Sequence, residues 1–181
     1  MDGLVTITGH NAQQSLSEAE ILGMVVWLWT HSQTHRVLPL AALNSQVYPV
    51  IRLGQYIVLC HANQPIAYAA WAALDERREQ NYLTRTSALQ TEQDWFSGNR
   101  YWITDFIAPF GHTNVLRHMI QSKLSEQPIR FLRHKGSDRG LKVIETHGLA
   151  LLSEEARHWF KNNPVCYPNS SPVSKQKELT K

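Results

Sequence analysis

The sequence predicts an α/β (α+β) domain in which a mixed central sheet carries helices on its faces. Stretches rich in Val, Ile and Tyr, which are typical of strands, are interspersed with stretches of helical period. The expected order is two helices, three strands, a charged segment, a strand, a helix, two strands and a last helix. Such interleaving is typical of a sheet with flanking helices.

The composition indicates one domain between two loose ends. With 181 residues, of which 43% are hydrophobic, and six Trp, the chain has ample material for a core. We expect a flexible N-terminal arm over 1–16, a single domain over 17–162 and a disordered tail over 163–181, which carries Pro and Ser.

The chain start and the cysteines favour a reduced, cytoplasmic protein. M-D-G-L-V-T-I-T-G-H lacks the basic stretch and apolar run of a secretory signal. The longest apolar run, Ile21–Trp29, is too short to span a bilayer, so we expect no transmembrane segment. Cys60 and Cys166 stand too far apart to indicate a disulfide framework.

The first half of the chain begins with a helix signal. Ser17–Glu20 fits a capping box, which predicts a helix to about Thr30. A turn should follow over 31–37, and Pro39 suits the first position of a short second helix through Leu43. We expect strands next over 48–53, 55–61 and 66–74.

The second half begins with a charged segment over 75–81 and a long connection to Asn99. Arg100–Ile107 is expected to be a central strand, and Thr113 can cap a helix to about Leu124. Strands over 129–135 and 141–147 should form a hairpin, and a last helix should end near Asn162.

Two histidines stand in the turn after the first helix. His31 and His35 are four residues apart, as zinc-binding histidines are on a helix, but Ser32 replaces the Glu of the H-E-x-x-H signature. No Cys or carboxylate lies nearby in sequence. A small zinc-binding cytoplasmic protein is therefore the weaker interpretation, and we expect no metal.

Asp105 is an acidic residue inside W-I-T-D-F-I-A-P-F, where burial without a partner is costly. It either caps the loop after the strand or orients a histidine or a cationic substrate. Cys60-His61 falls in an apolar strand, where Cys usually behaves as a small buried hydrophobe, so we assign Cys60 no catalytic role.

The stretch from Asn114 to Lys142 is basic, opposed only by Glu126 and Asp138. It is either a solvated face or a docking surface for an acidic partner. Only Phe131 could stack on bases there, so we expect no nucleic acid to bind. The basic residues of this stretch are Arg117, Lys123, Arg130, Arg133, Lys135, Arg139 and Lys142.

The sequence W-L-W-T-H-S-Q-T-H-R-V-L-P at 27–39 resembles the W-L-W-x-x-S-P-x-H-R-x-W-P stretch of the RTX-toxin-activating lysine acyltransferases, the hemolysin-activating protein family. The resemblance covers about residues 20–150. It continues in register through G-Q-Y-I-V-L at 54–59, P-I-A-Y-A-A-W-A at 65–72, G-N-R-Y-W-I-T-D-F-I-A-P-F-G at 98–111 and R-F-L-R at 130–133. Gln33, Leu38, Gln46 and Phe106 depart from the family pattern.

The resemblance implies a fold similar to the GCN5-related N-acetyltransferases and a homodimer with no bound cofactor. The implied donor is acyl-acyl carrier protein, and the implied acceptor is an internal lysine of an RTX protoxin. The essential histidine of the family falls on His35, its aspartate on Asp105 and its serine on Ser32, which we rate as supporting. Its arginine near the donor falls on Arg133, with Arg130 as the alternative.

One feature of the sequence favours a carrier protein as donor independently of the resemblance. The turn over 108–113 holds one Gly and a Pro that lacks an N–H group, so it is a poor cradle for a diphosphate. An acidic carrier protein on the basic stretch is the more natural donor. A non-catalytic toxin-binding partner is the other alternative, and the pattern specifies neither the acyl chain length nor the acceptor lysine.

Overall fold

A six-stranded sheet forms the centre of the structure, a computed structural model that describes residues 3–9, 16–84, 89, 91–134 and 141–165. The strands lie in chain order, and all neighbours are antiparallel except β4 and β5, which are parallel. They are β1 (Leu4–Thr8), β2 (Tyr56–His61), β3 (Gln64–Leu74), β4 (Arg100–Ile107), β5 (Pro128–His134) and β6 (Leu141–His147).

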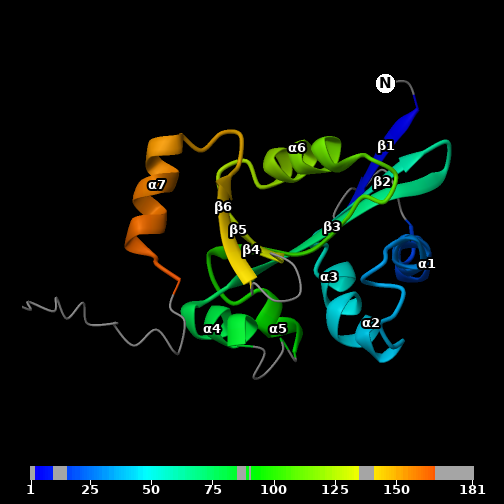
Figure 1. Cartoon of the computed structure of the whole chain (residues 1–181), viewed down its shortest axis with the longest axis horizontal. Helices are drawn as coiled ribbons and strands as arrows, with labels where there is room; N and C mark the ends of the chain where they lie inside the picture. Colours follow the sequence, from blue (N-terminus) through cyan, green and yellow to red (C-terminus); the bar gives the residue numbers. More distant parts are fainter. Residues whose placement is uncertain (1–2, 10–15, 85–88, 90, 135–140, 166–181) are drawn as a thin grey trace, which may run out of the picture.

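Helices cover both faces of this sheet. Helices α1 to α5 lie on one face, which we call the α1 face, and α6 lies on the other, the α6 face (Figure 1). Helix α7 packs beside β5 and β6 (Figure 1). The helices are α1 (Glu18–His31), α2 (Ala41–Gln46), α3 (Tyr48–Arg52), α4 (Glu76–Thr84), α5 (Glu92–Trp95), α6 (Thr113–Lys123) and α7 (Ser153–Asn162).

This architecture confirms the predicted mixed sheet with flanking helices. In the described part of the chain, no helix is both long and apolar enough to cross a bilayer.

Strand β3 divides the core into two parts. Tyr68, Ala70 and Ala72 point to the α1 face and pack with the buried side of α1. Ala69 and Trp71 point to the α6 face and pack with α6. Because both faces are covered, β3 is apolar at almost every position, as expected of a strand buried on both sides.

Several predicted elements are confirmed. Ser17 and Glu20 form the capping box of α1, with the Ser17 N–H donating to Glu20 Oε2 at 2.8 Å. Strand β4 lies between β3 and β5, and β5 and β6 pair antiparallel, although residues 135–140 between them lie outside the described residues. Helix α6 begins one residue earlier than expected, since His112 rather than Thr113 is its N-cap.

Residues 48–53 form the helix α3, so the prediction of a strand there is wrong. Val50 and Ile51 are buried next to each other, which an alternating strand pattern would not give. Pro49 sits in the first turn of the helix, where its missing N–H is not needed. The β-branched residues had favoured a strand, but burial against α1 outweighs that preference.

The expected loose ends are partly ordered. Residues Leu4–Thr8 pair with β2 as β1, so the prediction of a flexible arm is wrong for them. Gly9 packs so closely on Gly54 that a Cβ would lie 2.0 Å from the Gly54 Cα. At the other end, the carbonyls of Asn163 and Pro164 accept hydrogen bonds from Arg100. Residues 166–181 of the predicted tail lie outside the described residues.

A buried charge cluster joins α4 to the sheet. The Glu79 carboxylate, 1% exposed, accepts hydrogen bonds at 2.8 Å from Arg100, Arg130 and the Trp102 indole N–H. The Arg130 guanidinium also donates to the Asn163 carbonyl and lies over two aromatic rings of α7. The cluster therefore links α4, β4, β5 and the end of α7.

Replacing Glu79 with Ala should lower the free energy of unfolding by about 3–5 kcal/mol, because the buried arginines lose their counter-charge. Urea denaturation followed by Trp fluorescence measures the change. Glu76→Ala, at an exposed position of the same helix, is the matched control and should change stability by no more than about 0.5 kcal/mol. Equal unfolding midpoints for the two variants would contradict this role of Glu79.

Candidate active site

The end of α1 places His35. The Ser32 N–H donates to the Trp29 carbonyl at 3.1 Å, and the extended backbone of Ser32 ends the helix. The Arg36 N–H then donates to the Ser32 carbonyl at 3.0 Å, which closes a turn. This turn brings the His35 ring to 5.3 Å from the ring of Trp29, which is buried.

A bulge in β4 places Asp105. Ala70 and Trp71 of β3 pair with Asp105 and Ile103, so Thr104 is an extra residue in β4. Trp102 lies in the core of the α1 face, and strict alternation from it would turn position 105 to the α6 face. The extra residue instead turns Asp105 toward the α1 face, where α1 ends.

His35 and Asp105 meet there. His35 Nε2 lies 3.1 Å from Asp105 Oδ1, and the two side chains are 19% and 11% exposed. On its other side, His35 Nδ1 lies 2.7 Å from Ser32 Oγ and 3.0 Å from Thr34 Oγ1. A carboxylate can only accept, so Nε2 carries the proton and Nδ1 accepts from a hydroxyl. The structure thus brings Ser32, His35 and Asp105 into one hydrogen-bonded chain.

Two residues near this chain were not singled out from the sequence. Thr34 supplies a second hydroxyl to His35, and its only sequence signal is its position beside the histidine. Burial raises the pKa of Tyr68 well above its ordinary value, and the charge of Asp105 raises it further. Tyr68 therefore stays neutral beside the carboxylate.

The two histidines of the turn face different partners. His31 Nδ1 lies 2.8 Å from the Trp27 carbonyl, and its ring packs on Trp27 and Phe110. His35 faces Asp105 instead, so the pair does not converge on one point. Among the described residues, no three His, Cys, Asp or Glu side chains gather as metal ligands would.

The predicted donor arginines differ in exposure. Arg130 is 1% exposed and is held by Glu79 and Glu145, which favours Arg133 over Arg130 as the arginine near a donor. Arg133 is exposed on β5 and stays the candidate. Of the basic stretch, Arg117, Lys123 and Lys142 are also exposed, whereas Lys135 and Arg139 lie outside the described residues.

Cys60 is buried in β2, as the sequence indicated. Burial raises the pKa of its thiol, which lowers the fraction of reactive thiolate at neutral pH. Its role is therefore packing.

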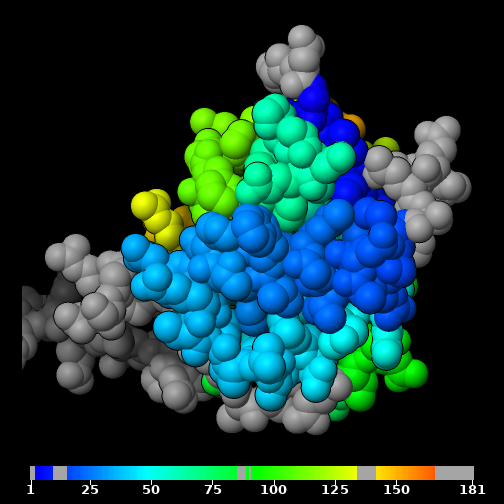
Figure 2. All heavy atoms as spheres, turned by 90° about the vertical axis from the view of Figure 1, so that its right-hand side faces the viewer, coloured from blue at the N-terminus to red at the C-terminus, as the bar shows by residue number. Residues whose placement is uncertain are grey.

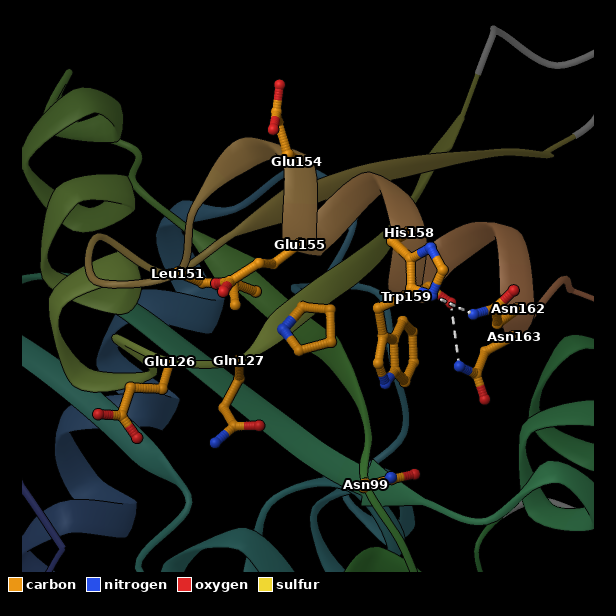
Figure 3. A pocket seen from close by; sticks show the side chains of 11 residues that line it. Asn99, Glu126, Gln127, Leu151, Glu154, Glu155, His158, Trp159, Asn162 and Asn163 are labelled. Carbon is orange, nitrogen blue, oxygen red and sulfur yellow. Dashed lines mark hydrogen bonds between the residues drawn. The ribbon is translucent and has the colours of Figure 1, made fainter.

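A hollow of about 780 Å³ lies at the other end of β4 (Figure 3). Asn99 lines it just before β4, and Asp105 lies six residues further on, about 20 Å along an extended strand. The hydrogen bonds drawn between residues that line the hollow join neighbours on or next to α7, such as His158 and Asn162 (Figure 3). They do not join a base to a buried carboxylate. We therefore take the pair of His35 and Asp105, rather than this hollow, as the candidate site.

Comparison with solved structures defines the class of fold. The chain is similar to the loading GNATL domain of CurA from Lyngbya majuscula, with a TM-score of 0.50 and 10% sequence identity. The similarity covers 71% of this chain and 64% of that chain. The fold is GNAT-like, which confirms the similarity to the GCN5-related N-acetyltransferases.

Comparison of sequences defines the family. Residues 14–147 match the model of the RTX toxin acyltransferase family. The chain is 42% identical to the leukotoxin-activating lysine-acyltransferase LtxC of Aggregatibacter actinomycetemcomitans, over 71% of this chain and 76% of the relative. It is 37% identical to the protein-lysine myristoyltransferases RtxC of Kingella kingae and HlyC of Escherichia coli, over 77% and 78% of this chain and 83% of each relative. The chain belongs to the RTX toxin acyltransferase family.

The protonation state of His35 can be measured without any substrate. Long-range proton–nitrogen correlation NMR should show the Nε2–H tautomer, because Asp105 accepts at Nε2. In Asp105→Asn the carboxamide no longer forces this tautomer, so an Nδ1–H signal should appear. His118, exposed on α6, is the internal control and should not change. An Nδ1–H tautomer in the wild type would contradict the geometry described for the site.

Proposed function

We propose that this chain transfers a fatty acyl group from acyl-acyl carrier protein to an internal lysine of an RTX protoxin and thereby activates the toxin. The observation that carries the proposal is the hydrogen-bonded chain of Ser32, His35 and Asp105. It lies in a family whose curated relatives are named lysine acyltransferases.

Lysine acylation requires a base. The lysine pKa of about 10.4 leaves roughly one amine in a few thousand neutral at pH 7, a barrier of about 4–5 kcal/mol. In the proposed reaction the amine attacks the thioester carbonyl, the C–N bond forms and the C–S bond breaks. The amine proton passes to His35 and then to the departing thiolate. Asp105 holds the ring in place and stabilises the imidazolium.

The Ser32 hydroxyl is a hydrogen-bond partner of His35 Nδ1. Because Nε2 faces Asp105, Nδ1 is the nitrogen that can accept a proton, and the Ser32 hydroxyl already lies 2.7 Å from it. We assign Ser32 the role of passing the amine proton to Nδ1 while the amine attacks the donor directly.

The strand next to the site supports approach of a thioester arm. In the described part of the chain, β4 pairs with β5 only through Tyr101–Ile103, so the end of β4 near Asp105 is not paired with β5. The exposed Arg117, Lys123 and Arg133 support docking of an acidic carrier protein.

The turn before α6 favours a carrier protein over a free nucleotide thioester. Pro109 lacks an N–H, and only Gly111, with φ of 86°, offers the backbone freedom of a diphosphate loop. The homodimer and the absence of a bound cofactor stay predictions from the resemblance. The cytoplasmic location stays a prediction from the chain start and the cysteines.

Co-expression with a protoxin and an acyl carrier protein, followed by mass spectrometry of toxin peptides, tests the proposal. The wild type should add a fatty acyl mass to a lysine. His35→Ala and Asp105→Asn should each reduce the rate about 10²–10⁴-fold, because the base or its orienting carboxylate is lost. His158→Ala, at an exposed position of α7, is the control and should retain activity.

The same experiment separates the alternatives. A non-catalytic partner would bind the protoxin and leave its mass unchanged, and a zinc protein would retain stoichiometric metal after purification without chelators. Acylation that survives in both His35→Ala and Asp105→Asn would overturn the assignment of the base.

Ser32→Ala should slow acylation about 10–100-fold, which is less than loss of His35, because Thr34 still offers a hydroxyl to Nδ1 at 3.0 Å. Thr34→Ala is the matched variant and should change the rate less than Ser32→Ala does. Single-turnover acylation measures both rates. A covalent acyl adduct on Ser32 in the wild type would show that the serine is a nucleophile rather than a relay.

A further inference from the structure

Helix α1 has a glycine where a side chain would be expected. Gly23 lies within the helix, and a Cβ built there meets no atom within 4 Å. Glycine is unfavourable in a helix interior. Crowding by neighbours does not explain its presence here, because the space around it is open. A shallow hollow of about 340 Å³ lies at this point, lined by Glu20, Gly23, Met24, Trp27 and Pro65.

An apolar stripe runs from this hollow toward the catalytic turn. Gly23, Trp27 and His31 are spaced four residues apart, so they lie on one face of α1 over about 12 Å. The rings of Trp27 and His31 are 4.5 Å apart, and those of His31 and Phe110 are 5.3 Å apart. Trp27 and Phe110 remain 42% and 41% exposed, so large apolar surfaces lie open along this stripe.

Other segments border the stripe. In the space-filling view, α1 (blue) faces the viewer, with the hairpin of β2 and β3 (teal) and the green segment after β4 against its upper edge (Figure 2). Pro65 of this hairpin and Phe110 after β4 belong to these bordering segments. These segments border the stripe along one edge (Figure 2).

The two ends of the stripe differ in chemistry. One end is His31, the last residue of α1, which directly precedes Ser32 and stands four residues before His35. The other end is Glu20, whose carboxylate is fixed by the Ser17 N–H and hydroxyl. An apolar ligand whose reactive end lies at Ser32 and His35 would therefore have the fixed carboxylate of Glu20 at its far end.

We propose that this stripe holds the acyl chain of the donor, with the thioester at Ser32 and His35 and the methyl end in the hollow beside Gly23. The inference rests on the proposed function, because that reaction needs an apolar surface continuous with the reaction centre. Trp27 and Phe110 contact the middle of the chain, and Gly23 and Glu20 set how long a chain is accepted. Each methylene that gains burial strengthens binding about fourfold.

Gly23→Leu tests this assignment because Leu favours a helix and fills the hollow. Purified protein is given protoxin and carrier protein loaded with octanoyl, dodecanoyl or hexadecanoyl chains, and acyl-lysine is counted by mass spectrometry. We expect hexadecanoyl transfer to fall about tenfold relative to octanoyl transfer, as loss of two or so methylene contacts predicts. Asn44→Leu, at an exposed position of α2, is the matched control and should keep the wild-type preference.

Trp27→Ala provides a second, independent variant and should also reduce hexadecanoyl transfer more than octanoyl transfer. Thermal unfolding of each variant shows whether it is folded, and if Gly23→Leu does not fold, Trp27→Ala decides. An unchanged chain-length preference in folded variants overturns the inference. An equal loss of all chains overturns it as well, and points to acceptor docking on this face. Absence of transfer by the wild type would instead overturn the proposed function.

Discussion

One extra residue in β4 decides which face of the sheet carries Asp105. The bulge at Thr104 is a local irregularity, yet the pair with His35 depends on it, because a regular strand would point the carboxylate toward α6. The turn after α1 supplies the other half of the pair. The site is therefore formed by two departures from regular structure, a helix end and a strand bulge, that meet on one face.

Strand β4 is fixed at both ends by charged groups. At its start, Arg100 and the Trp102 indole bond to the buried Glu79, and near its end Asp105 bonds to His35. A functional group held on a rigid strand keeps its geometry better than one on a loop. The cluster around Glu79 thus supports the site from the far end of the same strand, although it takes no part in the chemistry.

Much of the fold could be predicted from the sequence because its signals are local. The capping box of α1 and the apolar runs of β3 and β4 each depend on neighbouring residues. The predictions were wrong at positions whose structure is decided by contacts with residues distant in the sequence. Residues 48–53 are helical because of burial against α1. The burial of Arg130 also depends on a distant residue, because Glu79, 51 residues earlier, neutralises it.

The candidate site was predictable in part, again where the signal lies in neighbouring residues. Asp105 stood out because a carboxylate among large apolar residues needs a partner, and His35 stood out through the turn and the family pattern. The sequence carried no signal for the bulge that turns Asp105 toward α1, since an extra residue in a strand is defined by its neighbour. The hydroxyl of Thr34 and the buried Tyr68 likewise acquire meaning only from the three-dimensional arrangement.

The way the end of α7 is attached has a consequence for sequence variation. Arg100 and Arg130 bind the segment after this helix through the carbonyl oxygens of Asn163 and Pro164. Every residue type offers such an oxygen, so this attachment places no demand on the side chains at these two positions. The match to the family ends at residue 147, before α7 begins. Related chains can therefore diverge in side chains at these two positions and still anchor the segment in the same place, provided that the two arginines and Glu79 are kept.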